Sequence, residues 1–160
     1  MEDDIKTQFL KAYDAYADAL FRHCYFRIYD QELAKDLVQE AFCRTWDYLS
    51  QGKKISNLRA FLYQVLRNII VDEMRKRKHL SLDQLIEEGF YPVDKSGQNM
   101  EQTLIAKDVA SILKLLDEPY REVMQLRFID DLLPREIAAV LEVSENVVSV
   151  RIYRGIKKLR

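Results

Sequence analysis

The sequence predicts an all-α protein made of two small helical domains joined by a flexible linker, and three observations lead to that prediction. Apolar residues recur at intervals of three and four along most of the 160-residue chain, the period of helices packed on one side. Gly and Pro number only 4 and 3, and no alternation typical of strands recurs between turn residues. Clear periodicity is lost near residues 80–100, where glycine, proline and acidic residues gather. We therefore expect domains at residues 1–80 and 104–160, with a linker at 81–103.

Two long helices are expected at the start of the chain. A stripe that steps by three or four residues from Ile5 to Ile28 predicts a helix over residues 4–29. Asp30 is a suitable N-cap for a second helix, whose own stripe ends at Leu49. Charged residues on the exposed side of this helix lie four apart and share one face, a pattern that solvated charge pairs also produce. These residues are Asp36, Glu40 and Arg44, with Gln39 and Cys43 beside them.

A short exposed loop follows at residues 50–56, where Gly52 breaks the pattern and Ser56 is placed to cap the next helix. The third helix, residues 57–78, combines an apolar stripe with a basic end. The helix carries cations with one aromatic residue, Tyr63, among them. Cations suit phosphates, and an aromatic ring suits unstacked bases. The alternative is that the lysines and arginines only offset the negative end of the helix macrodipole and stay solvated.

The C-terminal part has the pattern of a helix-turn-helix. Helical spacing resumes at Leu104, and Pro119 and Pro134 suit the first turns of two further helices. Ser144 is placed to cap a final basic helix that extends to about Leu159. Two helices joined by a short turn, the second of them basic, form a motif that binds DNA through the second helix.

The net charge of −1 conceals an uneven distribution. It is −4 over residues 1–50, +6 over 51–79, −5 over 80–118 and +2 over 119–160. The two basic blocks are candidate phosphate-binding surfaces, and the acidic blocks are expected to weaken DNA binding by the isolated protein.

Other classes of site find little support in the sequence. Cys24 and Cys43 lie on apolar stripes without a CxxC neighbour, so both are expected to be core thiols in a reducing compartment. His23 and His79 have no partner at ligand spacing, so we expect no metal and no cofactor. No helix assembles paired acids, a nucleophile with its base or a phosphate loop, so we expect no enzyme. The polar N-terminus and the lack of a long apolar run predict a cytoplasmic protein without membrane insertion.

Three stretches, taken together and in order, resemble the extracytoplasmic-function (ECF) sigma factors of the sigma-70 family, the small two-domain initiation subunits of bacterial RNA polymerase. They are DLVQEAFCRTW at residues 36–46, FLYQVLRNIIVDEMRKRK at 61–78, and PYREVMQLRFIDDLLPREIAAVLEVSENVVSVRIYRGIKKL at 119–159. The resemblance implies a factor that binds core RNA polymerase and directs promoter-specific transcription initiation. It also implies promoter DNA and an anti-sigma factor as partners.

The resemblance assigns residues to three surfaces. In a first domain similar to sigma region 2, core-polymerase binding falls on Asp36, Gln39, Glu40 and Arg44. Recognition and melting of the minus-ten element fall on the third helix and the loop before it, which matches the family's base-holding loop poorly. The residues are Lys53, Lys54, Asn57, Arg59, Tyr63, Arg67, Asn68, Arg75, Lys76 and Lys78. In a second domain similar to sigma region 4, minus-thirty-five recognition falls on Ser144, Asn146, Ser149, Arg151, Arg154, Lys157 and Lys158.

The C-terminal motif departs from the family pattern at several positions. Glu142 and Asn146 stand where members often carry glycine, and Leu133 replaces a common Ser or Thr cap. Ser149 and Val150 replace a common Lys-Ser pair. The fold is expected to survive these changes, but the promoter sequence does not follow from the family pattern.

Two other interpretations explain parts of the chain. A self-sufficient helix-turn-helix regulator would bind an operator tightly without polymerase, but it leaves the basic third helix and its acidic neighbour unexplained. A sigma-like helical module would bind polymerase or a sigma inhibitor without opening a promoter.

Overall fold

A computed structural model of the chain describes residues 2–78, 109 and 111–160. All regular secondary structure in these ranges is helical, which confirms the predicted all-α class. The chain divides into two compact units, Met1–Pro92 and Val93–Arg160. The linker expected at residues 81–103 lies outside the described residues.

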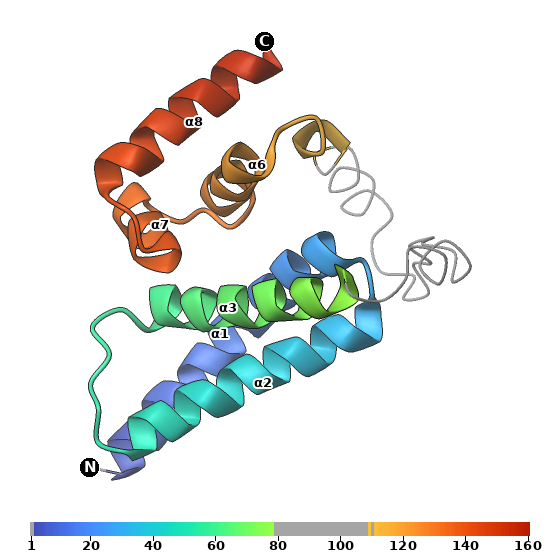
Figure 1. Cartoon of the computed structure of the whole chain (residues 1–160). Helices are drawn as coiled ribbons and strands as arrows, with labels where there is room; N and C mark the ends of the chain where they lie inside the picture. Colours follow the sequence, from blue (N-terminus) through green and yellow to red (C-terminus); the bar gives the residue numbers. More distant parts are fainter. Residues whose placement is uncertain (1, 79–108, 110) are drawn as a thin grey trace. The chain divides into compact units, whose positions relative to one another are not determined.

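Three helices form the first unit (Figure 1). These are α1 (Glu2–Ile28), α2 (Gln31–Ser50) and α3 (Leu58–Lys78), and each packs against the other two. Their bounds agree closely with the three helices expected from the apolar stripes. The core lies where the three stripes meet, and its fully buried side chains include Leu20, Leu62, Leu66 and Ile70. Burying an aliphatic side chain of this size contributes about 1.5–3 kcal/mol, so these positions hold the unit together.

The turn between α1 and α2 depends on two residues. Tyr29 has a left-handed backbone with φ of 55°, which ends α1 abruptly. Asp30 caps α2 as predicted, because its Oδ1 atom accepts a hydrogen bond from the backbone N–H of Leu33 at 3.1 Å. Such a cap is worth about 1 kcal/mol.

The apolar stripes of the first unit are less buried at their rim than expected. Tyr13 and Trp46 each remain 36% exposed. Their rings contact Phe42 and Phe9, with ring centroids 4.8 and 5.1 Å apart respectively, so each ring covers one side of the core and leaves its other side in solvent. An aromatic ring exposed at the rim in this way remains available to a partner.

The two cysteines have different environments. Cys24 is buried, and burial raises the pKa of its thiol to about 12, while the nearby Arg27 and Arg77 lower it by less. Cys43 is exposed on the outer side of α2, so the expectation of two core thiols is wrong for Cys43. Helical position explains the difference, since Cys43 lies among the charged outer residues beside Gln39 and Glu40, on the side of α2 opposite the buried stripe that ends at Leu49.

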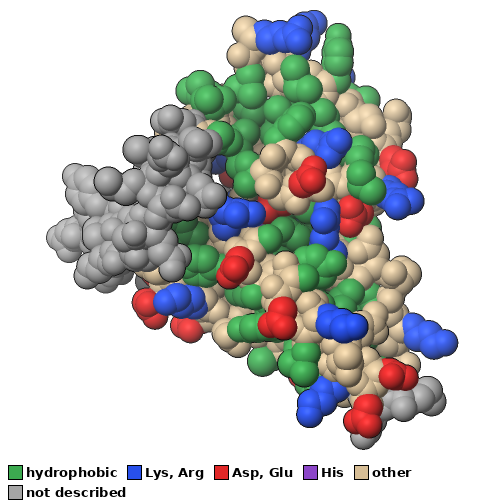
Figure 2. Space-filling model, turned by 180° about the vertical axis from the view of Figure 1, so that it is seen from behind, with side chains coloured by type: hydrophobic (Ala, Val, Ile, Leu, Met, Phe, Trp, Pro, Cys, Tyr) green, Lys and Arg blue, Asp and Glu red, His purple; other side chains and the backbone are tan. Residues whose placement is uncertain are grey.

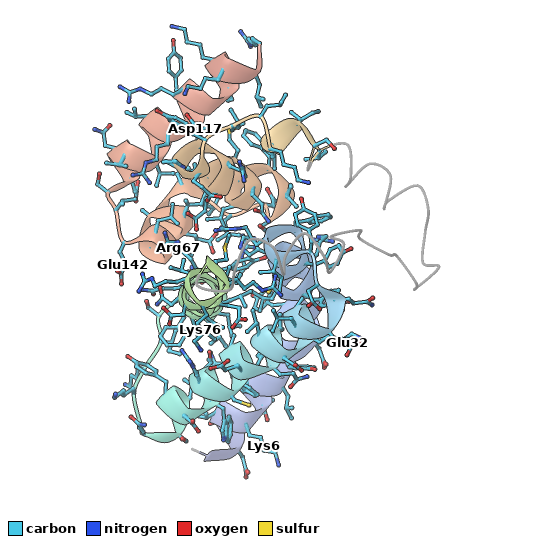
Figure 3. All side chains as sticks on the ribbon, turned by 45° about the vertical axis from the view of Figure 1, so that its right-hand side comes forward. Lys6, Glu32, Arg67, Lys76, Asp117 and Glu142 are labelled. Atoms are coloured by element: carbon cyan, nitrogen blue, oxygen red, sulfur yellow. The ribbon has the colours of Figure 1, made fainter. Side chains whose placement is uncertain are left out.

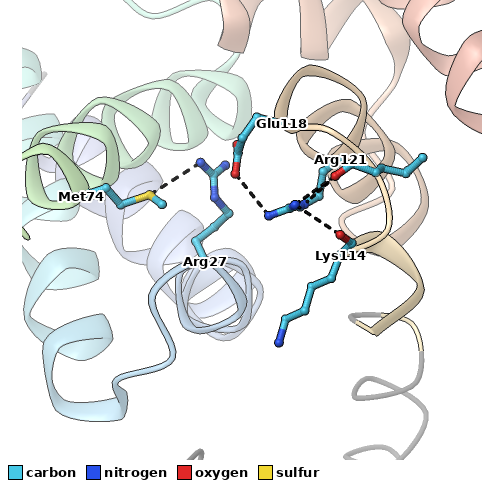
Figure 4. A network of polar contacts seen from close by, with 6 residues as sticks. Arg27, Met74, Lys114, Glu118 and Arg121 are labelled. Carbon is cyan, nitrogen blue, oxygen red and sulfur yellow. Dashed lines mark hydrogen bonds and ion pairs between the residues drawn. The ribbon is translucent and has the colours of Figure 1, made fainter. Parts of the chain in front are cut away.

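The second unit contains α6 (Glu118–Met124), η1 (Gln125–Ile129), α7 (Pro134–Leu141) and α8 (Glu145–Leu159). Its core includes a cluster of Leu113, Leu116 and Met124, against which Val109, Tyr120 and Ile129 pack. Pro119 occupies the first turn of α6, as predicted. Arg121 of α6 donates hydrogen bonds to the carbonyl oxygens of Leu116 at 2.9 Å and Lys114 at 3.4 Å, and so joins α6 to the turn before it (Figure 4).

The helix expected from Pro119 onward is not uniform. From Gln125 to Ile129 it widens into a π-helix, and the N–H of Asp130 donates to the carbonyl of Gln125, five residues back, at 3.1 Å. The expectation of one continuous α-helix is therefore wrong in its second half. Asp131, with φ of 57°, then reverses the chain, and Leu132 is fully buried.

The helix-turn-helix of α7 and α8 forms at the predicted positions. Leu133 offers no side-chain cap, but the carboxylate of Glu136 accepts from the backbone N–H of Leu133 at 3.1 Å. Glu142, in place of glycine, adopts the left-handed conformation of the turn with φ of 57°. Ser144 caps α8 through a hydrogen bond from Val147 N–H to its Oγ atom at 3.2 Å. The first two features show how the motif forms although Leu133 and Glu142 depart from the family pattern, and Ser144 caps α8 as predicted.

Candidate functional site

The outer face of α2 carries the charged residues that the sequence placed together. Asp36, Gln39 and Glu40 are all exposed. Glu40 pairs with Arg44 one turn later, and the two side chains keep 44% and 52% of their surface exposed. The amide of Gln39 donates to the Tyr13 hydroxyl at 3.4 Å, which ties this face to α1. We name Asp36, Gln39, Glu40 and Arg44 the α2 face; it is rigid, polar and accessible.

A groove of about 270 Å³ separates α2 from α3. It is lined by Leu37, Glu40 and Arg44 from α2 and by Ile69, Asp72, Glu73, Arg75 and Lys76 from α3. Part of the α2 face and the basic end of α3 therefore form opposite walls of one depression. No sequence pattern indicated this juxtaposition, because the two stretches are about thirty residues apart in the chain.

The basic end of α3 is divided between exposed and engaged cations. Arg75 and Lys76 are exposed; Lys76 is labelled in Figure 3. Arg77 instead contacts the carbonyl oxygen of Ile28 at 3.3 Å and the Oδ2 atom of Asp30 at 3.4 Å. The side chain of Lys78 lies outside the described residues. Arg77, the one cation of this run that was not assigned to DNA, is therefore engaged within the first unit.

The middle of α3 offers fewer groups to a base than expected. Asn68 is exposed, and Arg59 and Arg67 are half-buried (Figure 3 labels Arg67). Tyr63 is only 2% exposed, and its ring contacts His23 edge-on with centroids 5.4 Å apart. The expectation that Tyr63 offers stacking area is wrong, because Tyr63 lies three residues before the buried Leu66 and belongs to the core stripe.

The loop before α3 has an aromatic pair at its base. The rings of Tyr48 and Phe61, both half-buried, lie 4.8 Å apart, and the ammonium group of Lys53 lies 4.9 Å from the centroid of the Tyr48 ring. Lys54 is exposed. Asn57 caps α3, since its Oδ1 atom accepts from Ala60 N–H at 3.0 Å; the cap had been expected at Ser56.

The outward side of α8 mixes polar side chains with exposed apolar ones such as Val150 and Ile156. Val148 and Gly155 are buried, and a Cβ atom at Gly155 would lie 3.0 Å from the Cγ and Sδ atoms of Met124 on α6. Arg151 lies three residues after Val148 and four before Gly155. It is half-buried and borders the inner stripe that these two residues form. The exposed predicted residues of α8 and its cap are Ser144, Asn146, Ser149, Arg154, Lys157 and Lys158.

Two further residues of α8 change the predicted surface. Lys158 lies 3.6 Å from the carboxylate of Asp117 and 4.4 Å from the ring centroid of Tyr120, so its charge is already engaged within the unit. Tyr153 is 68% exposed and was not among the predicted residues. Its position four residues before Lys157 and seven after Asn146 places it on the outward face, so helical spacing was a sufficient signal.

Charge on the surface is otherwise mixed. On the face shown in Figure 2, Lys and Arg side chains lie among Asp and Glu side chains instead of forming one block of a single sign. Exposed cations therefore occur as small local groups, such as Arg75 with Lys76 and Arg154 with Lys157.

Comparison with known proteins agrees with this two-part organisation. Residues 12–80 match the family model of Sigma-70 region 2, and residues 106–159 match that of Sigma-70 region 4. The ECF RNA polymerase sigma factor SigW of Bacillus subtilis is 30% identical over 161 residues, covering 92% of this chain and 84% of SigW. The chain belongs to the ECF RNA polymerase sigma factors. It is thus a sigma factor, a regulatory protein that binds core RNA polymerase and directs promoter-specific initiation.

Other relatives are similar in extent. The ECF sigma factor SigL of Mycobacterium tuberculosis is 27% identical over 149 residues, covering 92% of this sigma factor and 84% of SigL. Among solved structures, CnrH in complex with the cytosolic domain of CnrY has a TM-score of 0.70 at 25% identity, covering 96% of this chain and 86% of that one. RpoE in complex with the anti-sigma factor NepR from Bartonella quintana has the same fold, with a TM-score of 0.70 at 23% identity over 95% and 94% of the two chains.

Two kinds of feature are absent from the part of this sigma factor that the structure describes. None of its described helices is both long and apolar enough to cross a bilayer. Within the same residues, no three His, Cys, Asp or Glu side chains are grouped as a metal site would require.

Proposed function

We propose that this sigma factor divides its work among three surfaces: the α2 face binds core polymerase, α3 with its preceding loop opens and reads the minus-ten element, and α8 reads the minus-thirty-five element. The observation that carries the proposal is the groove between α2 and α3. Because Glu40 and Arg44 form one wall and Arg75 and Lys76 the other, polymerase bound at α2 would lie directly beside DNA held at α3.

The stacking surface for an unpaired base is assigned to Tyr48 in place of the buried Tyr63. Tyr48 is half-buried, with Phe61 beside its ring and the Lys53 ammonium group over it. An unpaired base that displaced Lys53 would stack on the Tyr48 ring. The displaced ammonium group would then contact the phosphate of the same nucleotide. Base–aromatic stacking is worth about 1–3 kcal/mol, comparable with the cost of extracting a base. Asn68 supplies an exposed amide on the neighbouring helix.

The polymerase supplies the chemistry in this proposal, and the sigma factor itself is not an enzyme. Its place of action is the cytoplasm, where polymerase and promoter are found. An anti-sigma factor is the further partner that we propose. The similarity to CnrH, which was solved with the cytosolic domain of CnrY bound, supports a regulatory protein partner of this kind.

Reconstituted transcription tests the proposal. Core polymerase, the wild-type chain and a DNA library randomised at the minus-ten and minus-thirty-five positions should yield transcripts from a selected subset of sequences. Asn68→Ala should leave core binding and the closed complex intact but reduce permanganate reactivity of unpaired thymines, and a premelted bubble should restore it. Specific DNA binding without polymerase would instead indicate a self-sufficient regulator, and polymerase binding without transcripts would indicate a sigma-like module.

A further inference from the structure

One guanidinium group joins the ends of all three helices of the first unit. Arg77, in the last turn of α3, contacts the carbonyl oxygen of Ile28, the last residue of α1, at 3.3 Å. It also contacts the Oδ2 atom of Asp30, the N-cap of α2, at 3.4 Å. Glu73, one turn earlier in α3, lies 4.0 Å from the Nε atom of Arg77. Only 21% of the Arg77 side chain is exposed, which distinguishes it from Arg75 and Lys76.

Each contact satisfies a group that the local fold leaves available. The last carbonyl groups of a helix have no partner within the helix and carry partial negative charge, so a cation at Ile28 is favourable. The Asp30 carboxylate serves two helices at once, because Oδ1 accepts from Leu33 N–H while Oδ2 faces Arg77. A planar guanidinium with several N–H groups can make these contacts together, whereas an ammonium group is a single point charge.

This junction lies at the end of α3 that carries the exposed cations. Arg75 and Lys76 precede Arg77 directly and line the groove opposite Glu40 and Arg44 of the α2 face. Helix ends fray unless their last turn is held, so the contacts of Arg77 restrict how far its two neighbours move relative to α2.

We infer that Arg77 is a positioning residue: it anchors the last turn of α3 to the α1–α2 turn and so holds Arg75 and Lys76 at a set distance from the polymerase-docking α2 face. The inference rests on the proposed function, because it assumes that these two cations contact promoter DNA in the holoenzyme. Arg77 itself contacts no phosphate, although it belongs to the same run of four cations.

The test compares two adjacent residues that carry the same charge. Arg77→Gln and the matched control Lys76→Gln each remove one positive charge from the full-length chain. Core polymerase affinity is measured first, and then promoter affinity of the holoenzyme over a range of salt concentrations, on a promoter selected with the wild type. Lys76→Gln should reduce the slope of log affinity against log salt by about 0.9, the value for one lost phosphate contact. Arg77→Gln should weaken promoter binding by about two- to fivefold, as for one partly exposed ion pair, with slope and core affinity unchanged.

A variant of Asp30, the partner of Arg77, keeps the test valid even if Arg77→Gln fails to fold. Asp30→Ser retains an N-cap hydroxyl for α2 and removes the carboxylate that faces Arg77. It should reproduce the loss of promoter affinity, the double variant should lose no more than either single one, and Arg77→Lys should recover only part of the affinity. The inference is overturned if Arg77→Gln lowers the salt slope as much as Lys76→Gln, or if Asp30→Ser binds promoter like the wild type. Failure of the wild-type holoenzyme to bind any promoter would contradict the proposed function instead.

Discussion

Charge reversal on the α2 face gives the sharpest test of how this sigma factor binds polymerase. Asp36→Lys combined with Glu40→Lys changes two exposed carboxylates, four residues apart, into cations. Two unit charges 4 Å apart interact by about 1 kcal/mol in water, so each reversal that turns an attraction into a repulsion changes the binding free energy by about 2 kcal/mol. The double variant should therefore bind core polymerase up to about a thousandfold more weakly, and less so at high salt.

The fold should tolerate the same change. The double substitution removes the Glu40 carboxylate that pairs with Arg44, and an exposed pair at this spacing is worth about 0.3–0.5 kcal/mol. The melting temperature should fall by only a few degrees, since about 1 kcal/mol shifts a domain of this size by about 4–8 °C. Core affinity is measured by fluorescence anisotropy of the labelled chain, with circular dichroism at each concentration used.

The matched control places the same charges on the same spacing elsewhere. Asp14 and Asp18 of α1 are both exposed and also lie four residues apart, so Asp14→Lys with Asp18→Lys gives an identical change in net charge within the same unit. This control should bind core polymerase within about twofold of the wild type, because its charges lie on α1, outside the α2 face, and exposed charges are screened by salt. Equal losses in the two double variants, or no loss in either, would refute the assignment of the α2 face.

Three further predictions follow from the burial of particular side chains. Tyr48→Ala should reduce open-complex formation with little change in stability. Tyr63→Ala should instead cost about 3–5 kcal/mol of folding free energy, as for a fully buried aromatic residue, and differential scanning calorimetry with permanganate footprinting separates the two effects. Arg154→Ala should lower promoter affinity. Loss of a phosphate contact would weaken binding to all sequences and reduce the slope of log affinity against log salt by about one, whereas loss of a base contact would cost about 1–3 kcal/mol at one base pair. An unchanged affinity at every salt concentration would exclude both contacts. Iodoacetamide at pH 8 should alkylate the exposed Cys43 and spare Cys24, because burial raises the pKa of the Cys24 thiol to about 12 from 9.0. The contribution of the protonated Cys24 thiol to folding stability is fully present below about pH 9 and is lost as the pH rises towards 12. Labelling of Cys24 in the native protein at pH 8 would contradict its burial.

Local chemistry explains the features that were predictable from the chain alone. The helices of the first unit follow from stripes at three- and four-residue spacing, and Asp30 and Ser144 cap their helices because a short side-chain oxygen reaches a nearby N–H. Pro119 and Pro134 lie in the first turns of their helices, because proline lacks only an N–H that has no helical partner at these positions. These effects operate within four residues of sequence, so no knowledge of the fold is needed to recognise them.

Two candidate site residues contact neighbours from other helices that the sequence did not reveal. Tyr63 has the aromatic side chain that stacking requires, but it is buried in the core, where its ring contacts His23 of α1 edge-on. Lys158 has the position of a DNA contact, but Asp117 and Tyr120 of α6 engage it. Tyr153 shows the opposite error, because it is exposed on the outward face of α8 but was not among the predicted residues.

The sequence by itself determined the all-α class, the bounds of the first three helices and the sigma-factor family, because periodicity, capping and motif order are properties of the chain read in one dimension. The tertiary structure alone decided which cations are free to meet DNA and which are used inside the protein. Arg75, Lys76 and Arg77 are adjacent and chemically alike, yet Arg77 is directed to Ile28 and Asp30, about forty-seven residues earlier in the chain. Successive residues of a helix point about 100° apart, so one of three neighbouring cations meets the α1–α2 turn while the other two line the groove, and only the packing of α3 against α1 and α2 selects which one.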